Sequence, residues 1–219
     1  MARPLSLSEL MFAPNLIRDA RLYLVAPARL RAGRLEDLVE ELAAAGVDLI
    51  QLREKDLEPK RILEVGAPIA EACRRVGIPF VINDRPDIAL ALRADGLHLG
   101  QDDIPLEIAR GIVPGILIGG STHSPEQVAR ATHEDWDYFA VGPVFETPTK
   151  PGRPGTGLDL IRYAAERAKR SVWFAIGGMD ASNLDDVMEA GARRVVVVRA
   201  ITEAADPPKA AAELKVRLG

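Results

Sequence analysis

The stretch PFVINDRPDIALALRADGLHLGQDDIPLEIARGIVPGILIGGST (79–122) decides the fold of this chain. It contains short apolar runs at 79–84, 96–101 and 116–122, separated by longer segments of mixed polarity. Short apolar runs bounded by Gly, Pro, Asn or Asp are typical of buried strands. The mixed segments between them fit helices with one apolar face. The stretch therefore predicts strands that alternate with helices.

The same alternation extends over the rest of the chain. Between further apolar runs, apolar side chains recur at helical spacing, for example at Leu35, Val39 and Leu42. Strands that are each followed by a helix lie parallel and are joined by right-handed crossovers. Eight candidate strands result when the remaining runs are added, at 21–26, 47–54, 138–144, 172–178 and 193–200.

The number of units separates two architectures. Eight strand-helix units in 219 residues match a closed barrel. An open doubly wound sheet more often has five or six strands and a glycine-rich turn after the first one. Residues 26–32 read APARLRA and lack that turn. We therefore predict an α/β fold, a single (β/α)8 TIM barrel with parallel strands over 21–219, with residues 1–20 as an N-terminal extension packed on it.

Composition limits the partners of the chain. It has 28 Lys and Arg residues against 32 Asp and Glu residues, a formal net charge of −4. This balance argues against sequence-independent binding of nucleic acid or of an anionic membrane, so small molecules are the expected partners. No apolar run approaches the length of a membrane-spanning helix, residues 1–20 lack a signal-peptide pattern, and Cys73 is the only cysteine. We expect a cytoplasmic protein, and the sequence leaves a homo-oligomer open.

The residues that follow the predicted strands form the candidate site, because parallel strands of a barrel present those loops on one face. On strand two, Gln51, Arg53 and Lys55 are spaced two apart and project the same way. Two cations side by side are unfavourable unless an anion compensates them, and phosphate suits both. Lys150 adds a third cation near the same rim. The alternative is that these cations form ion pairs with neighbouring acids such as Glu54.

Two carboxylates follow consecutive strands, Asp84 after strand three and Asp103 after strand four. The fold brings such residues within reach of one metal ion, and Mg²⁺ prefers one or two carboxylates with water and phosphate oxygens. Each Asp alone fits a turn or helix cap equally well, since both lie near a proline. Taken with the three cations, the pair predicts a magnesium-dependent pyrophosphate site.

The segment 142–158 is too rich in Pro and Gly for a helix or strand, and we expect it to be a lid. Thr147 and Thr149 supply hydroxyls there; the alternative is an ordinary mobile surface loop. Gly177 and Gly178 permit backbone amides to approach a ligand, although any tight turn could use them.

The histidines give no clear catalytic signal. His98 fits a hydrogen-bonded core residue as well as a ligand contact, His123 has better access to the site, and His133 is expected in solvent. The chain has no HExxH, CxxC, P-loop or nucleophile elbow. The residues therefore predict no covalent catalysis by a nucleophilic triad.

Six segments follow one another along the chain: QLREKD (51–56), VINDRPDIAL (81–90), ADGLHLGQDD (94–103), STHS (121–124), GPVFETPTK (142–150) and AIGG (175–178). In this order they closely resemble the thiamine phosphate synthase family, and the resemblance runs from about Leu22 to Ile201. It implies a TIM-barrel transferase of thiamine biosynthesis that joins 4-amino-2-methyl-5-hydroxymethylpyrimidine diphosphate to 4-methyl-5-hydroxyethylthiazole phosphate, or its carboxylated form. The implied products are thiamine phosphate and pyrophosphate.

The resemblance also implies a role for each matching residue. Metal binding falls to Asp84 and Asp103, and catalysis to Arg53, Lys55, Ser121 and Lys150. The pyrimidine diphosphate would be held by Gln51, Arg53, Lys55, Asn83, Ser121 and Lys150. The thiazole phosphate would be held by Thr147, Thr149 and Gly178, with backbone groups at Ala200 and Ile201. One departure is Arg199, where the family commonly has a small hydroxyl residue.

The family's proposed mechanism is dissociative, so it needs no protein nucleophile. Pyrophosphate leaves first, and the thiazole nitrogen then captures the pyrimidine cation. The nearest alternative is a thiazole tautomerase on the same barrel, for which His123 is the candidate proton-transfer residue. A phosphate-ligand sensor and a sugar-phosphate epimerase are further alternatives.

Overall fold

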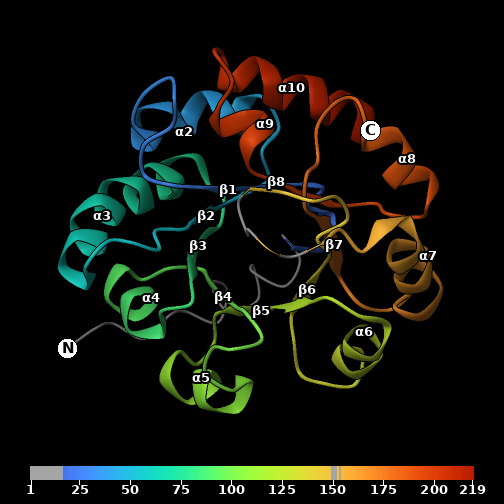
Figure 1. Ribbon diagram of the computed structural model, residues 1–219. Coiled ribbons are helices and arrows are strands. Elements are labelled where there is room, and N and C mark those ends of the chain that lie inside the picture. Colours follow the sequence, from blue (N-terminus) through green and yellow to red (C-terminus); the bar gives the residue numbers. More distant parts are fainter. Residues whose placement is uncertain (1–16, 149–151, 153) are drawn as a thin grey trace.

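The computed structural model describes residues 17–148, 152 and 154–219, and these form a closed barrel of eight parallel strands (Figure 1). Each strand pairs with the next along the chain, and β8 closes the barrel on β1 through the pair Leu22↔Val195. The predicted (β/α)8 barrel is confirmed. The strands are β1 (Leu22–Ala26), β2 (Leu49–Leu52), β3 (Phe80–Asn83), β4 (Gly96–Leu99), β5 (Leu117–Thr122), β6 (Tyr138–Val141), β7 (Trp173–Ile176) and β8 (Val195–Val197).

Helices surround the strands as an outer ring (Figure 1). Successive strands are connected through one helix each, and two helices follow β8. Among the described helices, none is both long and apolar enough to cross a bilayer. The helices are α2 (Leu35–Ala44), α3 (Pro59–Val76), α4 (Pro86–Leu92), α5 (Leu106–Ile112), α6 (Pro125–Ala131), α7 (Gly157–Arg167), α8 (Leu184–Glu189), α9 (Arg199–Thr202) and α10 (Pro207–Leu218).

The strands read as continuous apolar runs because both of their faces are buried. On β1, Leu22 and Leu24 face outward and pack in the cluster between strands and helices, whereas Tyr23 and Val25 face the barrel interior. Ile17 joins the interior cluster from the segment just before β1. The proposed extension 1–20 lies for the most part outside the described residues, and its packing on the barrel stays a prediction.

The barrel interior is filled by three aromatic rings. Tyr23, Tyr138 and Phe174 contact one another edge to face, with ring centroids 5.5–5.9 Å apart. Gly119 on β5 makes room for them, since a Cβ there would lie 2.1 Å from Cζ of Tyr138. A bulky ring on β6 therefore requires a residue without a side chain on β5.

A repeated carboxylate contact closes the amino-terminal end of the barrel. Asp48, Asp95 and Asp137 directly precede β2, β4 and β6, and each accepts a backbone N–H at the start of the preceding strand. The N–H donors are those of Leu22, Phe80 and Ile118, at 2.8, 2.9 and 2.7 Å. The contact ties strands one and two, three and four, and five and six together.

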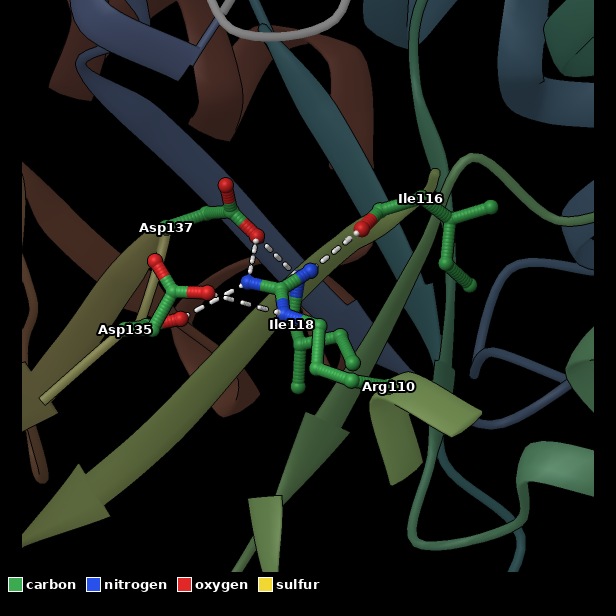
Figure 2. Close-up of polar contacts among 5 residues, drawn as sticks. All are labelled: Arg110, Ile116, Ile118, Asp135 and Asp137. Carbon is green, nitrogen blue, oxygen red and sulfur yellow. Dashed lines mark hydrogen bonds and ion pairs between the residues drawn. The ribbon is translucent and has the colours of Figure 1, made fainter. Parts of the chain in front are cut away.

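Arg110 supports the third of these contacts (Figure 2). Its guanidinium donates to Asp137 Oδ2 at 2.6 Å, and to the backbone carbonyls of Ile116 and Asp135 at 2.9 and 2.8 Å. The Asp137 carboxylate thus accepts from both an arginine and the Ile118 N–H. Because charge-assisted contacts of this kind are stronger than neutral ones, this corner of the barrel is a stability element rather than a reactive one.

We expect the Asp137→Ala variant to unfold more easily, with a free energy of unfolding about 2 kcal/mol lower. The reason is that the Ile118 N–H and the mostly buried Arg110 both lose an acceptor. Urea unfolding measures the change. Asp135→Ala is the matched control, because the Asp135 side chain is 95% exposed and its backbone contact to Arg110 survives. An equal loss in both variants would contradict this role of Asp137.

Candidate active site

A cavity of about 670 Å³ opens at the carboxyl ends of the strands. It is formed by residues from every strand end or following loop, as the barrel topology predicts. Thr149 and Lys150 lie outside the described residues. The predicted site residues that line the cavity are Gln51, Arg53, Lys55, Asn83, Asp84, Asp103, Ser121, Thr147, Gly178 and Ala200.

Two cations from the end of β2 enter the cavity. Lys55 Nζ donates to Asp84 Oδ2 at 2.5 Å, so its partner comes from the next strand and not from its own loop. Glu54 instead accepts the N–H of Ala28 at 2.7 Å. Arg53, which is half-buried, has no ion pair or side-chain hydrogen bond within the described part of the chain. A half-buried guanidinium without a counter-charge is unfavourable, and a bound anion would compensate it.

Asp84 and Asp103 meet at the same rim. Asp84 has a backbone φ of 62°, the left-handed region that Asp and Asn tolerate better than most residues. Its N–H donates to the His98 carbonyl at 2.8 Å, which fixes the turn after β3 against β4. Asp103 Oδ2 accepts the N–H of Gly100 at 2.6 Å. The two carboxyl groups lie close enough for each to shift the pKa of the other.

Their contact moves the two pKa values apart. Burial and the neighbouring Asp84 carboxylate raise the pKa of Asp103. Burial opposes ionisation of Asp84 as well, but hydrogen bonds from Lys55 and Asp103 and the charge of Lys55 outweigh it, so the pKa of Asp84 is lowered. Asp84 is therefore the member of the pair that ionises first, and Asp103 the member that keeps its proton to higher pH.

This pair fits a hard divalent cation better than a soft one. Both carboxylates offer oxygen ligands to a cation, which binds their deprotonated form. No group of three or more His, Cys, Asp or Glu side chains suited to a metal occurs within residues 17–148, 152 and 154–219. A site of two carboxylates completed by water and phosphate oxygens matches the usual coordination of Mg²⁺.

The floor of the cavity is a row of hydrogen-bonded side chains. Gln51 and Ser121, both predicted as site residues, are connected through Tyr23, Tyr138 and His98. His98 is buried and bonded through both ring nitrogens, while His133 is exposed as predicted. Sequence reasoning missed the two tyrosines. The available signal was their rarity, since the chain has only three tyrosines and two stand inside predicted strands.

The two glycines after β7 allow the loop after β6 to pack closely against them. Gly177 and Gly178 have φ values of 108° and 68°, and a Cβ on either would lie 2.5 Å from Pro143 or 2.8 Å from the Cβ of Phe145. Phe145 N also donates to the Gly177 carbonyl at 3.1 Å. The glycines are therefore needed for close packing of this loop, besides lining the cavity. Movement of the 142–158 segment as a lid stays a prediction.

The turn after β8 differs in detail from the prediction. Ala200 lines the cavity, but Ile201 is buried and its N–H donates to the Val198 carbonyl at 3.1 Å. Arg199 reaches the cavity mouth and pairs with Glu203 at 2.8 Å.

His123 follows β5, and its Nδ1 lies 2.5 Å from the Gly142 carbonyl. This contact connects the turn after β5 to the loop after β6.

Comparison with known proteins shows the family of the chain. A family model described as "Thiamine monophosphate synthase" matches residues 22–201. The chain belongs to the thiamine monophosphate synthase family. It is 57% identical to the thiamine-phosphate synthase of Acidothermus cellulolyticus, over 92% of this chain and 96% of that protein. It is 53% identical to the thiamine-phosphate synthase of Thermus thermophilus, over 90% and 97% respectively.

A solved structure extends the comparison to three dimensions. The thiamine phosphate pyrophosphorylase of Pyrococcus furiosus superposes with a TM-score of 0.83 at 32% identity, covering 93% of this chain and 98% of that one. The thiamine monophosphate synthase family predicted from the six segments is thereby confirmed, and so is its barrel.

Proposed function

We propose that this chain is a thiamine-phosphate synthase acting on the two phosphorylated substrates that the sequence predicts. It joins the aminopyrimidine diphosphate to the thiazole phosphate and releases pyrophosphate. The observation that carries the proposal is the meeting of Arg53, Lys55 and the Asp84–Asp103 pair on one cavity. Family membership supplies the substrate class, and the paired charges account for a diphosphate.

The reaction breaks the bond between the pyrimidine methylene carbon and the diphosphate oxygen, whose electron pair leaves with pyrophosphate. The thiazole nitrogen then forms the new carbon–nitrogen bond with its own electron pair. Arg53 and Lys55 stabilise the charge that accumulates on the leaving group, and we propose the same for Lys150. Asp84 and Asp103 would hold Mg²⁺, which when bound would supply further neutralisation of the negative charge on the leaving group.

The remaining residues orient the two rings and exclude water. We propose that Gln51, Asn83 and Ser121 hold the pyrimidine diphosphate. Thr147, Thr149, Gly178 and the backbone at Ala200 would hold the thiazole phosphate. Ile201 is not included, because its N–H is already bonded to Val198. Arg199 reaches the cavity mouth and is paired with Glu203.

We also propose that residues 21–219 form one catalytic domain. A cytoplasmic location is consistent with a single, buried cysteine. A homo-oligomer stays a prediction.

A coupled pyrophosphate assay tests the proposed activity. With both substrates and Mg²⁺, we expect one pyrophosphate released for each thiamine phosphate formed, and no release when either substrate is left out. The stoichiometry follows from the single bond broken and the single bond formed. Tight binding of both substrates without pyrophosphate release would contradict the proposal and indicate a sensor. Isomerisation of the thiazole phosphate without the pyrimidine would indicate a tautomerase.

A further inference from the structure

Five buried side chains form a continuous hydrogen-bonded row beneath the cavity. Gln51 Nε2 donates to Tyr23 Oη at 2.5 Å, and Tyr23 Oη lies 3.0 Å from Tyr138 Oη. Tyr138 Oη lies 3.2 Å from His98 Nδ1, and His98 Nε2 lies 3.0 Å from Ser121 Oγ. All five side chains are at most 7% exposed. The row runs from β1 and β2 through β6 to β4 and β5, and all of its members except Tyr138 line the cavity.

Counting protons fixes the direction of the bonds in this row. Burial raises the pKa of both tyrosine hydroxyls, so each keeps its proton to donate. Tyr23 Oη already accepts from Gln51, and within the described residues Tyr138 Oη is the acceptor in reach of its proton. Tyr138 must then donate its own proton to His98 Nδ1. A neutral His98 consequently carries its proton on Nε2 and donates it to Ser121 Oγ.

This direction decides what Ser121 offers to the cavity. Since Ser121 Oγ accepts from His98, its own proton is directed away from the imidazole and is available to a ligand acceptor. The reverse direction would aim the Ser121 proton at His98 and leave the buried Tyr23 proton without an acceptor, which is costly. The hydroxyl is therefore presented as a donor before any substrate arrives.

Tyr138 is the central member and is held firmly. Its ring lies against Gly119, where no Cβ could fit, and packs edge to face on Tyr23 and Phe174. Gly119 precedes Ser121 by two residues on β5, so the same strand carries the support and the end of the row. Tyr138 itself is not among the residues that line the cavity in the described part of the chain. Any effect of its hydroxyl on the substrate must pass through its neighbours.

We infer that Tyr138 is a positioning residue whose hydroxyl, acting through His98, sets Ser121 as a hydrogen-bond donor to the pyrimidine diphosphate. The inference rests on the proposed function for the identity of the substrate. The hydroxyl of Tyr23 has the supporting role of fixing the direction in which Tyr138 donates.

A double-mutant cycle tests this coupling. We expect Tyr138→Phe to lower kcat/KM for the pyrimidine diphosphate about ten- to hundredfold, because the ring and its packing remain but the link to His98 is lost. In a Ser121→Ala background, the same change should have less than about a twofold effect, since its target is absent. The KM for the thiazole phosphate should stay within about twofold. Equal effects of Tyr138→Phe in both backgrounds would overturn the inference.

The tautomer of His98 gives a readout that is independent of turnover. The chain has only three histidines, so long-range ¹H–¹⁵N spectra of labelled protein can be assigned with His98→Gln and His133→Gln variants. We expect the Nε2–H tautomer of His98 in the wild-type chain, and a mixture or the Nδ1–H form in Tyr138→Phe. An Nδ1–H tautomer in the wild-type chain, or a tautomer unchanged by Tyr138→Phe, would overturn the inference.

The controls separate this inference from the proposed function. Tyr163→Phe removes a tyrosine hydroxyl on α7, outside the cavity lining, and should leave both kcat/KM and the His98 spectrum unchanged. Tyr23→Phe is a second variant that should reproduce the kinetic effect if Tyr138→Phe folds poorly. A wild-type chain that releases no pyrophosphate contradicts the proposed function, whereas the His98 spectrum tests the row in either case.

Discussion

Replacing Asp103 by asparagine is expected to lower the rate of pyrophosphate release by about 10³-fold while leaving the free energy of unfolding nearly unchanged. Asparagine has the shape of the protonated acid, and Asp103 is the member of the pair whose pKa is raised, by burial and by the Asp84 carboxyl. Its Oδ1 can still accept the N–H of Gly100, which Asp103 accepts at 2.6 Å, and its amide can donate to Asp84. The variant should therefore fold normally but bind Mg²⁺ poorly.

The coupled pyrophosphate assay and urea unfolding are measured together on this variant. Asp159→Asn is the matched control, because that carboxylate is 94% exposed on α7 and away from the cavity. It should change neither quantity. Near wild-type turnover in Asp103→Asn would contradict the assignment of Asp103 as a metal ligand. A large loss in the free energy of unfolding would mean that the Asp84–Asp103 pair is mainly structural.

The architecture could be predicted from sequence because the fold repeats one signal. Each apolar run had to be buried on both faces, and the structure places a strand within every one of them, as with β2 at Leu49–Leu52 inside the predicted 47–54. The strand ends were set too long because polar residues that follow, such as Arg53, continue the alternation beyond the last residue paired in register, Leu52. Local periodicity does not mark where pairing stops.

The cavity-lining side chains could be predicted because barrel topology sends strand ends to one face. Gln51, Asn83 and Ser121 needed only the strand assignment to be placed there. Partners were not predictable in the same way. Lys55 pairs with Asp84, which lies in the turn just after β3. The pair depends on the shape of that turn, where the backbone φ of Asp84 is positive.

The buried row and the amino-terminal carboxylates were beyond sequence reasoning for a related reason. The contact between Tyr23 and Tyr138 joins residues 115 apart, and it exists only because the barrel closes and Gly119 leaves room. Asp137 looks like an ordinary polar residue before a strand until Ile118 and Arg110 are placed beside it. Such contacts are consequences of tertiary packing and carry no local pattern.

Withdrawal of Mg²⁺ is the second change for which we expect a large effect. The leaving pyrophosphate carries more negative charge than Arg53 and Lys55 can neutralise alone, since Lys55 is already paired with Asp84. Chelation should therefore lower pyrophosphate release by about 10³-fold or more, and added Mg²⁺ should restore it. The free energy of unfolding should fall by no more than the amount that Mg²⁺ binding to the folded chain contributes.

The central claim is that a carboxylate pair and two cations at the ends of β2, β3 and β4 stabilise a departing pyrophosphate with the help of Mg²⁺. The most direct test is the initial rate of pyrophosphate release by the wild-type chain, with both substrates saturating, as free Mg²⁺ is varied from chelated to millimolar. We predict a rate that rises from near zero to a plateau in the wild type and stays low throughout in Asp103→Asn. A wild-type rate that is the same in excess chelator and in millimolar Mg²⁺ would contradict the claim.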